Sequence, residues 1–511
     1  QSRHDSMLYS WGRGEDGQCG NGSTNDQEMP MPVEGLKHLT VVQIACGSGH
    51  TVVLTEDKDV WSWGRGDDGR LGHADNHWKY VPHLVSALTG KSIKQVTCGS
   101  YHTAAISDTG ALWTWGGGMY GKLGHGNEVG HPAPCRVEAF IGREVEQIAC
   151  GSRHTAALLA GGEVYCWGDR ENGVCGIGEA AEHQYLPKKL EALKGVKITQ
   201  IAACGFHTAA ITQDGALWSW GEGKFGRLGQ GNEKNQVTPC CVEGLQGVRV
   251  KQVACGGFHS ACVTEDGDVL TFGGGEHGQL GHGDKTNRTV PCLVKALEGA
   301  GIVQVTCGWS HTVTLSEDGK VFTFGNGDHG KLGHGANAKS ALPKLVESLA
   351  NMKVAKVASY NEHTVALCHA EQEQAVMSFD FLKDLRRLIN NADFADVVFL
   401  VEGQRVHAHR AVLAMRCQHF RAMFKSGMRE SWEEEVAIPG TRQVIFLLLL
   451  EYLYTDLVPS DTMLPETAIE LFIAADMYGV ERLKRACENV FQTGLNIENA
   501  ATLLQTAENF K

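Results

Sequence analysis

Short runs of alternating apolar and polar residues fill the first 370 residues and predict β-strands. One clear stretch has three such runs, Ile93–Cys98, His102–Ser107 and Ala111–Gly116, with the turn Asp108–Gly110 between the second and the third. The short apolar piece Cys135–Val137 predicts a fourth strand. Four short strands without a helical period are typical of one blade of a β-propeller.

The same pattern returns every 52 or 53 residues, and three markers follow it. A histidine followed by a small residue occurs at His50, His102, His154, His207, His259, His311 and His363. The glycine that ends an aromatic–glycine pair occurs at Gly12, Gly64, Gly116, Gly168, Gly221, Gly273 and Gly325. A third marker occurs at Gly20, Gly72, Gly124, Gly176, Gly229, Gly281 and Gly333. Seven copies of each predict a repeat array in which every unit buries its faces against its neighbours.

The phase of the repeat at its two ends predicts a closed ring. The chain begins within a third strand, Leu8–Gly12, and the repeats end after a second strand, His363–Leu367. Together these ends supply the missing halves of one blade, and closure removes exposed strand edges. We therefore predict an all-β, seven-bladed β-propeller over residues 1–370.

A different pattern follows and predicts an α/β domain. After a polar linker at residues 371–378, apolar residues at helical spacing predict a helix at Phe379–Ile389. Strands are expected at Asp396–Val401 and Arg405–Ala408. Further helices are expected at Ala411–Phe424, Gln443–Tyr454, Pro465–Tyr478 and Glu481–Phe491. This second domain spans residues 379–492.

Charge and hydropathy argue against two classes of partner. The formal net charge is −13 and no basic run stands out, so nucleic acid and anionic membrane surfaces are not favoured. No apolar run is long enough for a membrane span, and no secretory signal is visible. Because the chain begins with Gln1 rather than Met, we expect a natural N-terminal segment to be missing.

The seventeen cysteines do not suggest a disulfide framework. Six of them take the same place beside a glycine in successive repeats, and equivalent positions of separate units cannot readily pair: Cys46, Cys98, Cys150, Cys204, Cys255 and Cys307. We expect them to be small buried residues in a reducing compartment, the cytoplasm or the nucleus.

Three further signals in the repeats imitate chemistry. The pattern G-x-G-x-x-G at Gly12, Gly14 and Gly17 recurs in five later repeats, but no helix follows it, as a dinucleotide site requires. Cys98 and His102 have a metal-like spacing, but each repeat offers one such pair and structural zinc needs four ligands. Eight of the eleven tryptophans lie in the aromatic–glycine strands and are expected to pack between blades. We therefore expect turn glycines, hydrogen-bonded core histidines, no cofactor and no metal.

The signature W-G-x-G-x-x-G-x-L-G-x-G, with C-G-x-x-H-T upstream, resembles the regulator of chromosome condensation repeat family. The resemblance covers residues 1 to about 370 and implies a seven-bladed propeller. Two units depart from the pattern: Arg170 replaces a glycine in the fourth, and Ala358–Tyr360 replaces the Cys-Gly step in the last. Photoreceptors on this propeller use clustered tryptophans in G-W-R-H-T motifs, which only Gly308–Thr312 approaches here.

The run Asp396-Val397-Val398, then His407–Ala414, Phe420 and Met423-Phe424, closely resembles a BTB/POZ domain. The resemblance implies an α/β module that forms homodimers or hetero-oligomers. It also implies a charged pocket containing Asp396 and Arg410, for which the alternative role is an ordinary buried ion pair. Residues 493–511 resemble the start of a helical BACK segment, within which the chain stops.

Many BTB domains are substrate adaptors of cullin-3 ubiquitin ligases and carry a hydrophobic-x-Glu motif after the helix that ends in Met-Phe. This chain has Met428-Arg429-Glu430 in that place, where methionine offers a flexible apolar anchor and glutamate a directional acceptor. The alternative is a solvated acidic turn that continues into Glu433–Glu435.

Three hypotheses about function follow from these resemblances. The first is a dimeric cullin-3 adaptor, without enzymatic activity of its own, whose propeller binds an unknown protein substrate. The second is guanine-nucleotide exchange on a small GTPase, as in the founder of the propeller family. That founder uses an inserted wedge, whereas the repeat here lengthens by a single residue, between Gly168 and His207. The third is a BTB scaffold without ligase activity.

Overall fold

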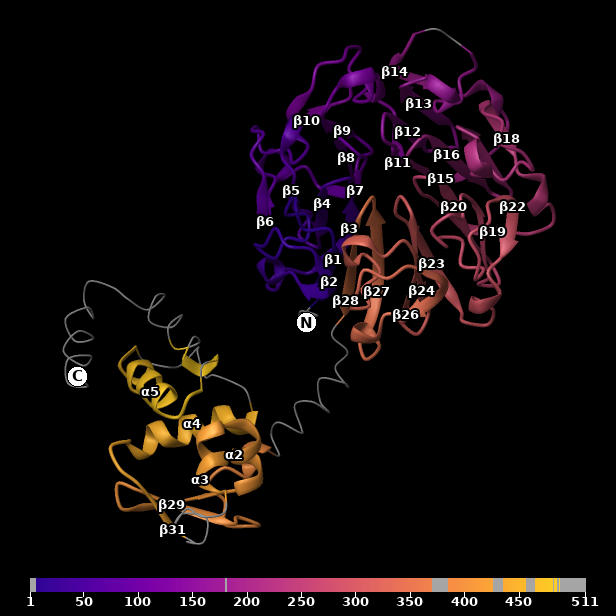
Figure 1. The fold of residues 1–511 in the computed structure, drawn as a ribbon. Helices are drawn as coiled ribbons and strands as arrows, with labels where there is room; N and C mark the ends of the chain where they lie inside the picture. The colour runs from indigo at the N-terminus through magenta and orange to yellow at the C-terminus, as the bar shows by residue number, and fades with distance from the viewer. Residues whose placement is uncertain are drawn as a thin grey trace. The chain divides into compact units, whose positions relative to one another are not determined.

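The computed structural model describes residues 6–179, 182–369, 385–425, 435–455, 465–480, 482–484 and 487. The chain divides into two compact units, Gln1–Glu371 and Gln372–Lys511 (Figure 1). The expected linker at residues 371–378 and the segment at residues 493–511 lie outside the described residues. Among the described residues, no helix is both long and apolar enough to cross a membrane.

The first unit is a seven-bladed β-propeller, as predicted. In the described part of this unit, seven antiparallel sheets of four strands are arranged around a central axis (Figure 1). The strands are β3 (Val41–Cys46), β4 (His50–Thr55), β5 (Val60–Gly64) and β6 (Lys79–Leu84) in blade 1; β7 (Ile93–Cys98), β8 (His102–Ser107), β9 (Leu112–Gly116) and β10 (His131–Arg136) in blade 2; β11 (Val145–Cys150), β12 (His154–Leu159), β13 (Val164–Gly168) and β14 (Gln184–Lys189) in blade 3; β15 (Ile198–Cys204), β16 (His207–Thr212), β17 (Leu217–Gly221) and β18 (Gln236–Cys241) in blade 4; β19 (Val250–Cys255), β20 (His259–Thr264), β21 (Val269–Gly273) and β22 (Arg288–Leu293) in blade 5; β23 (Ile302–Cys307), β24 (His311–Ser316), β25 (Val321–Gly325) and β26 (Ser340–Leu345) in blade 6; and β27 (Lys353–Tyr360), β28 (His363–His369), β1 (Ser6–Gly12) and β2 (Gln27–Pro32) in blade 7.

The strand predictions for blade 2 are confirmed for β7, β8 and β9, and wrong in the bounds of the fourth strand. β10 begins at His131, four residues before the predicted start, and its register with β9 shifts between His131 and Cys135. Pro132 and Pro134 hide this strand from an alternation rule. Proline is tolerated there because β10 is the outer edge of the sheet, where no ladder hydrogen bond is required of it.

The two ends of the propeller share blade 7, as the repeat phase predicts. β1 pairs antiparallel with β28, from Ser6 opposite His369 to Gly12 opposite His363. Figure 1 shows the indigo β1 and β2 beside the orange β28. This pairing joins residues more than 350 positions apart in the chain, so the ring of blades is complete only when both ends are in place.

Short 3-10 turns join the strands and the blades. Five of the twelve described turns follow a third strand and contain a residue of positive φ, such as Asp68 at 59° or Tyr120 at 66°. The turns are η1 (Glu34–Leu36), η2 (Asp67–Gly69), η3 (Ser86–Leu88), η4 (Met119–Gly121), η5 (Glu138–Phe140), η6 (Glu171–Gly173), η7 (Glu191–Leu193), η8 (Lys224–Gly226), η9 (Glu243–Leu245), η10 (Lys295–Leu297), η11 (Asp328–Gly330) and η12 (Glu347–Leu349).

The core of the propeller lies between neighbouring blades. Trp115 of β9 is fully buried, and its Nε1 donates a 3.0 Å hydrogen bond to the carbonyl of Arg70 in the preceding blade. Gly72 lies against this indole: a Cβ there would be 2.8 Å from Trp115 Nε1, and φ is +81°. The third marker of the repeat is therefore glycine because the aromatic ring of the next blade occupies the space of a side chain.

Glutamine side chains join the innermost strands of neighbouring blades. The Gln43 amide donates to the carbonyl of Val96 at 3.2 Å and accepts from the N–H of Val96 at 3.0 Å. Gln147 and Gln252 make the same pair of bonds to Ile201 and Val305. These amides satisfy the polar groups of inner strand edges, which would otherwise lack partners around the central channel.

The second unit, described by itself, is a small α/β domain. β29 (Val397–Val401) pairs antiparallel with β30 (Gln404–Ala408) and parallel with β31 (Glu435–Ile438). The described helices are α2 (Arg410–Arg416), α3 (Gln418–Met423), α4 (Gln443–Thr455) and α5 (Pro465–Met477). The rings of Phe399, Phe420 and Phe446 form the centre of the core, with centroids 5.2–6.5 Å apart.

Several predictions for this unit need correction. The single helix expected at Ala411–Phe424 is two helices, because Cys417 is extended with φ −137° and ψ 124°. β31 was not predicted, although Glu435–Ile438 alternates. The helix expected at Phe379–Ile389 falls mostly outside the described residues, and the one at Glu481–Phe491 falls partly outside them. The α4 and α5 predictions are confirmed to within one residue.

The contact between Gly72 and Trp115 predicts the effect of adding one methyl group. Gly72→Ala adds left-handed strain and a clash with the indole, so it should lower the free energy of unfolding by about 2–4 kcal/mol. Gly90→Ala is the matched control, because Gly90 also has positive φ but nothing lies within 4 Å of its Cβ position. It should cost only about 1–2 kcal/mol. Equal losses in urea denaturation would contradict the assigned role of the indole.

Candidate functional site

The seven marker histidines form a closed circle of hydrogen bonds between blades. Each side chain is fully buried, and its Nε2 lies within hydrogen-bond distance of a hydroxyl in the next blade. The pairs are His50–Thr103 at 2.9 Å, His102–Thr155 at 2.8 Å, His154–Thr208 at 2.7 Å, His207–Ser260 at 2.8 Å, His259–Thr312 at 2.8 Å, His311–Thr364 at 3.1 Å and His363–Thr51 at 2.9 Å. The expectation of a hydrogen-bonded core histidine is confirmed.

The hydrogen bonds of the hydroxyls determine the tautomer of these histidines. Thr155 Oγ1 donates to the carbonyl of Lys122 at 2.7 Å, so it accepts from His102 Nε2. Burial lowers the pKa of His102 well below its usual range, so the imidazole is neutral, with its proton on Nε2 and a lone pair on Nδ1. Burial lowers the pKa of His154 to about 4 and that of His363 to about 3. These groups bond each blade to the next, and they stay neutral at neutral pH.

The glycine loops and the cysteines also serve the fold. A Cβ at Gly14 would lie 1.9 Å from the carbonyl oxygen of Asn25, so this glycine allows two backbone segments to approach closely. All seventeen cysteines are free, and burial raises the pKa of Cys204 to about 12. A buried thiol of this kind is inert as a nucleophile.

Tyr360 lies where the last repeat departs from the Cys-Gly pattern. It comes from β27 and lines the central channel, which has a volume of about 260 Å³. Its hydroxyl lies 3.0 Å from Ser100 Oγ, which in turn lies 2.9 Å from Ser152 Oγ. One residue from blade 7 therefore reaches blades 2 and 3 across the axis.

The loops beside the marker histidines carry cationic and aromatic side chains on one face of the propeller. Arg70 and Lys122 lie 5.2 and 5.9 Å from the ring of Tyr101, and Arg153 lies 4.9 Å from the ring of Tyr120. Of these groups, Tyr101, Tyr120, Lys122 and Arg153 line a pocket of about 490 Å³, which the exposed Met119 also lines. Tyrosine, arginine and methionine are the residues enriched in protein interfaces. This pocket is the best candidate for a binding site on the propeller.

Trp309 does not belong to a cluster of tryptophans at its repeat position. Its ring is in edge contact with Phe258, with centroids 5.7 Å apart. Ser48, Ser100 and Ser152 take the corresponding position in blades 1 to 3. The chain therefore lacks the repeated arrangement on which tryptophan-based photoreception depends.

Asp396 and Arg410 are brought together in the second unit, but they are not a buried ion pair. Asp396 Oδ1 accepts the backbone N–H of Arg410 at 2.6 Å, and the carbonyl of Asp396 accepts Arg410 Nε at 3.0 Å. The guanidinium also lies 4.9 Å from the ring of Phe424. Asp396 is exposed and Arg410 is half-buried in the single chain, so the alternative of an ordinary buried ion pair does not describe them there. Both side chains are accessible at the start of α2.

The motif Met428-Arg429-Glu430 lies outside the described residues. Its place in the chain is nevertheless defined, since α3 ends at Met423 and β31 begins at Glu435.

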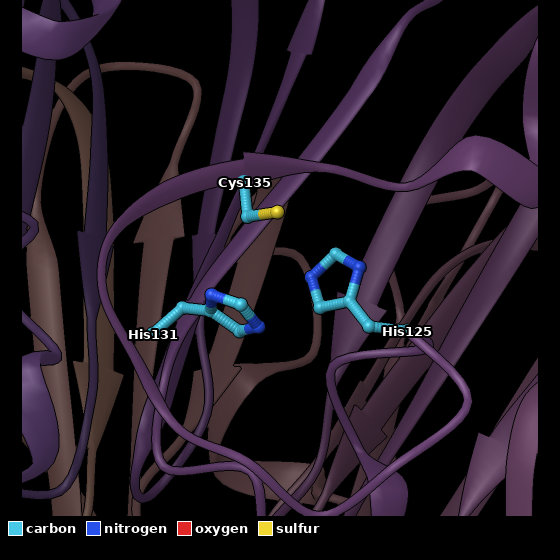
Figure 2. Close-up of side chains that lie close together, drawn as sticks. All are labelled: His125, His131 and Cys135. Atoms are coloured by element: carbon cyan, nitrogen blue, oxygen red, sulfur yellow. The ribbon is translucent and has the colours of Figure 1, made fainter.

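A group of metal-ligand types occurs on blade 2, where His125, His131 and Cys135 point toward one another (Figure 2). Their ligand atoms lie within 4.8 Å of one another. However, His125 Nε2 lies 3.0 Å from Thr114 Oγ1, and this hydroxyl donates its hydrogen bond to the carbonyl of Leu123. The imidazole therefore donates from Nε2, and a metal at that atom would have to break this bond.

The same histidine–hydroxyl bond occurs in three other blades. In these blades the positions that correspond to His131 and Cys135 do not hold both a histidine and a cysteine. The pairs are His73–Ser62, His282–Thr271 and His334–Thr323, each at 3.0 Å. We therefore assign His125 to the fold rather than to a metal site. No spacing rule points to the triad in the sequence, because its members come together only through the shifted register of β10.

Comparison with known families agrees with both parts of the architecture. Residues 7–366 match the family model of the RCC1-like domain, and residues 385–495 match that of the BTB/POZ domain. The Ultraviolet-B receptor UVR8 of Arabidopsis thaliana is 39% identical over 328 residues, which are 64% of this chain and 74% of that protein. The human E3 ubiquitin-protein ligase HERC2 is 40% identical over 311 residues, which are 60% of this chain but only 6% of that much longer protein.

Solved structures show the same propeller. Human WBSCR16 superimposes with a TM-score of 0.65 at 27% identity, covering 71% of this chain and 99% of that structure. Prp20p from Saccharomyces cerevisiae also gives a TM-score of 0.65, at 21% identity, covering 75% of this chain and 96% of its own. At the lower identity the likeness establishes the fold alone.

The neutral marker histidines predict an acid-sensitive propeller. Their folded pKa values lie below the unfolded value of 6.5, so their stabilisation is present above that pH and is lost as pH falls through it toward 4. Each histidine should remove up to about 1.4 kcal/mol per pH unit in this range. We expect urea denaturation to show uptake of several protons on unfolding between pH 6.5 and 5. His363→Gln, which removes one titrating group, should lower that number by one. A stability independent of pH in this range would contradict the neutral circle.

Proposed function

The chain belongs to the RCC1-like domain family and joins this propeller to a BTB/POZ domain, and from this combination we propose that it is a substrate adaptor of a cullin-3 ubiquitin ligase. The combination of two interaction modules in one chain is the observation that carries the proposal. In this role the chain needs no catalytic residue, because the other components of the ligase transfer ubiquitin. We place its action in the cytoplasm or nucleus, which suits a protein whose cysteines are all free.

The propeller would bind the substrate. Its closed circle of inter-blade bonds makes a rigid platform, and the pocket beside Tyr101 and Tyr120 offers interface-type side chains. Binding to a preformed surface avoids the entropy of ordering loops, which favours affinity.

The BTB/POZ domain would dimerise and recruit the cullin. Asp396 and Arg410 are accessible and could contribute to a charged pocket at the start of α2. A dimer would hold two propellers and raise the avidity for a substrate with two binding sites. The cullin contact is assigned to Met428, Arg429 and Glu430, which follow α3 in the chain as the motif of cullin-binding BTB domains does.

The cullin assignment predicts the outcome of a co-precipitation of the full chain with purified cullin-3. The wild-type protein should bind, and Met428→Ala/Glu430→Ala should bind at least about ten-fold more weakly, as expected for loss of central anchor residues. Met415→Ala/Asp393→Ala is the matched control, because it removes an exposed methionine and an exposed carboxylate elsewhere in the same domain. It should bind like the wild type, and light scattering should show the same dimer for all three proteins.

The alternatives make different predictions in the same assay. A dimer that does not bind cullin-3 would overturn the adaptor role and leave the scaffold. Accelerated release of labelled GDP from a Ran-type GTPase, together with no cullin binding, would instead favour nucleotide exchange. Equal loss in the control variant would overturn the assignment of the contact to Met428 and Glu430.

A further inference from the structure

Four repeats place a cation at the same buried position of the loop after the third strand. The side chains of Arg70, Lys122, Arg227 and Lys331 are 0–2% exposed. The backbone carbonyls of Arg70, Lys122 and Lys331 each accept hydrogen bonds from a hydroxyl and an indole of the next blade. The position is thus structurally fixed, and the charge of its side chain must be compensated inside the protein.

Three of these four cations have a carboxylate partner. Arg70 pairs with Asp68 at 3.0 Å and Arg227 with Glu222 at 2.9 Å, while Lys331 pairs with Glu362. Lys122 is the exception: in the part of the chain that the structure describes, its Nζ donates to the carbonyl of Met119 at 3.1 Å, and no carboxylate lies within 4.0 Å.

The repeat shows how the partner of Lys122 is lost. The three carboxylates lie two residues before, five residues before and thirty-one residues after their cations. The corresponding positions around Lys122 are Tyr120, Gly117 and Arg153. None is acidic, and one is a second cation. Blade 2 therefore lacks an acidic residue at each of the three positions from which the other blades pair their cation.

The aromatic rings near Lys122 do not make up for this loss. Nζ lies 5.9 Å from the rings of both Tyr101 and Tyr120, close to the limit of a cation–π contact. Arg70 and Arg227 also lie over aromatic rings, at 5.2 and 5.8 Å, and yet each keeps its carboxylate. Arg70 and Arg227 therefore have both kinds of compensation, whereas Lys122 has only the rings.

Of these four cations, Lys122 is the one that lines the pocket beside Tyr101 and Tyr120. The pocket of about 490 Å³ contains two acidic residues, but both are engaged: Asp68 with Arg70, and Glu128 with the N–H of Tyr120 at 3.2 Å. Burial lowers the pKa of Lys122 to about 8. The carboxylates of Asp68 and Glu128 raise this pKa, whereas the guanidiniums of Arg70 and Arg153 lower it further. An incoming anion would remove this cost.

We propose that the pocket beside Lys122 binds a carboxylate side chain of an acidic segment in a protein partner. The carboxylate would take the place that Glu222 and Glu362 hold beside Arg227 and Lys331, with the rings of Tyr101 and Tyr120 against the aliphatic part of the acidic side chain. The partner is a protein in keeping with the proposed adaptor function, on which this step rests. The alternative anionic polymer, a single-stranded nucleic acid, is distinguished by the test below.

The test uses the full chain and a fluorescein-labelled peptide containing a short run of glutamates, with a glutamine counterpart of equal length. In fluorescence anisotropy at low salt, the glutamate peptide should bind about ten-fold or more tightly than the glutamine peptide, as expected for a charge-assisted bond to a buried ammonium. Equal affinities, or tighter binding of a single-stranded DNA of the same charge, would overturn the proposal.

The sharpest variant restores the internal partner that the repeat has lost. Gly117→Glu reproduces the place of Glu222, and the backbone allows it: φ is not positive, and a Cβ would lie 3.4 Å from its nearest neighbours, an ordinary contact. In this variant the ratio of the affinities for the glutamate and the glutamine peptide should fall about ten-fold, whereas Gly117→Gln should keep the wild-type ratio. Lys122→Met should also lose it.

The outcomes separate this inference from the proposed function. Retention of the full preference in Gly117→Glu would overturn the pocket, whatever the cullin assay shows. Loss of cullin-3 binding in the Met428→Ala/Glu430→Ala protein with an unchanged glutamate preference would leave the pocket intact, because the two assays probe different units. Thermal melting of each variant monitors folding.

Discussion

The propeller depends on a circle of seven hydrogen bonds in which a neutral histidine of each blade donates to a hydroxyl of the next. The hydroxyl in turn donates a hydrogen bond to a backbone carbonyl. In several blades the same carbonyl also accepts a hydrogen bond from an indole N–H. This arrangement explains several features of the repeat at once. In five blades the glycine three residues before the histidine leaves room for the imidazole, since a Cβ at Gly151, for example, would lie 2.2 Å from His154 Cε1. The circle also requires that the two ends of the propeller meet, because His363 and Thr364 lie in the blade that β1 completes.

Positions where the repeat is broken are informative because the remaining copies show what the ordinary residue does. Tyr360 replaces a glycine and reaches across the channel to Ser100. Lys122 keeps the buried cation of its position but loses the carboxylate that Arg70, Arg227 and Lys331 retain. The first departure adds a contact within the fold, whereas the second leaves a buried cation without a carboxylate partner, which is the basis of the proposed pocket. A repeat protein thus carries its own controls for distinguishing structural residues from recognition residues.

Much of the architecture could be predicted from the sequence, because the period, the phase of the ends and the alternation are local properties. The seven blades, the shared blade and the buried cysteines follow from them. What could not be predicted depends on contacts between distant loops: the pairing of Lys331 with Glu362, or the meeting of His131 with His125, has no signature in spacing. In the second unit, the break at Cys417 lies inside a continuous helical pattern, and Cys417 is extended and buried there. The exposure of Asp396 could not be predicted, because a family motif specifies residues but not their exposure.

The circle of neutral histidines can be observed directly by nitrogen-15 NMR of histidine-labelled protein. The marker resonances would be assigned by replacing one histidine at a time with glutamine and followed from about pH 8 to about pH 5, across the ordinary titration of histidine. The account predicts that all seven remain in the form protonated at Nε2 and bare at Nδ1 throughout. Titration of these resonances near pH 6.5, or a proton at Nδ1, would contradict it.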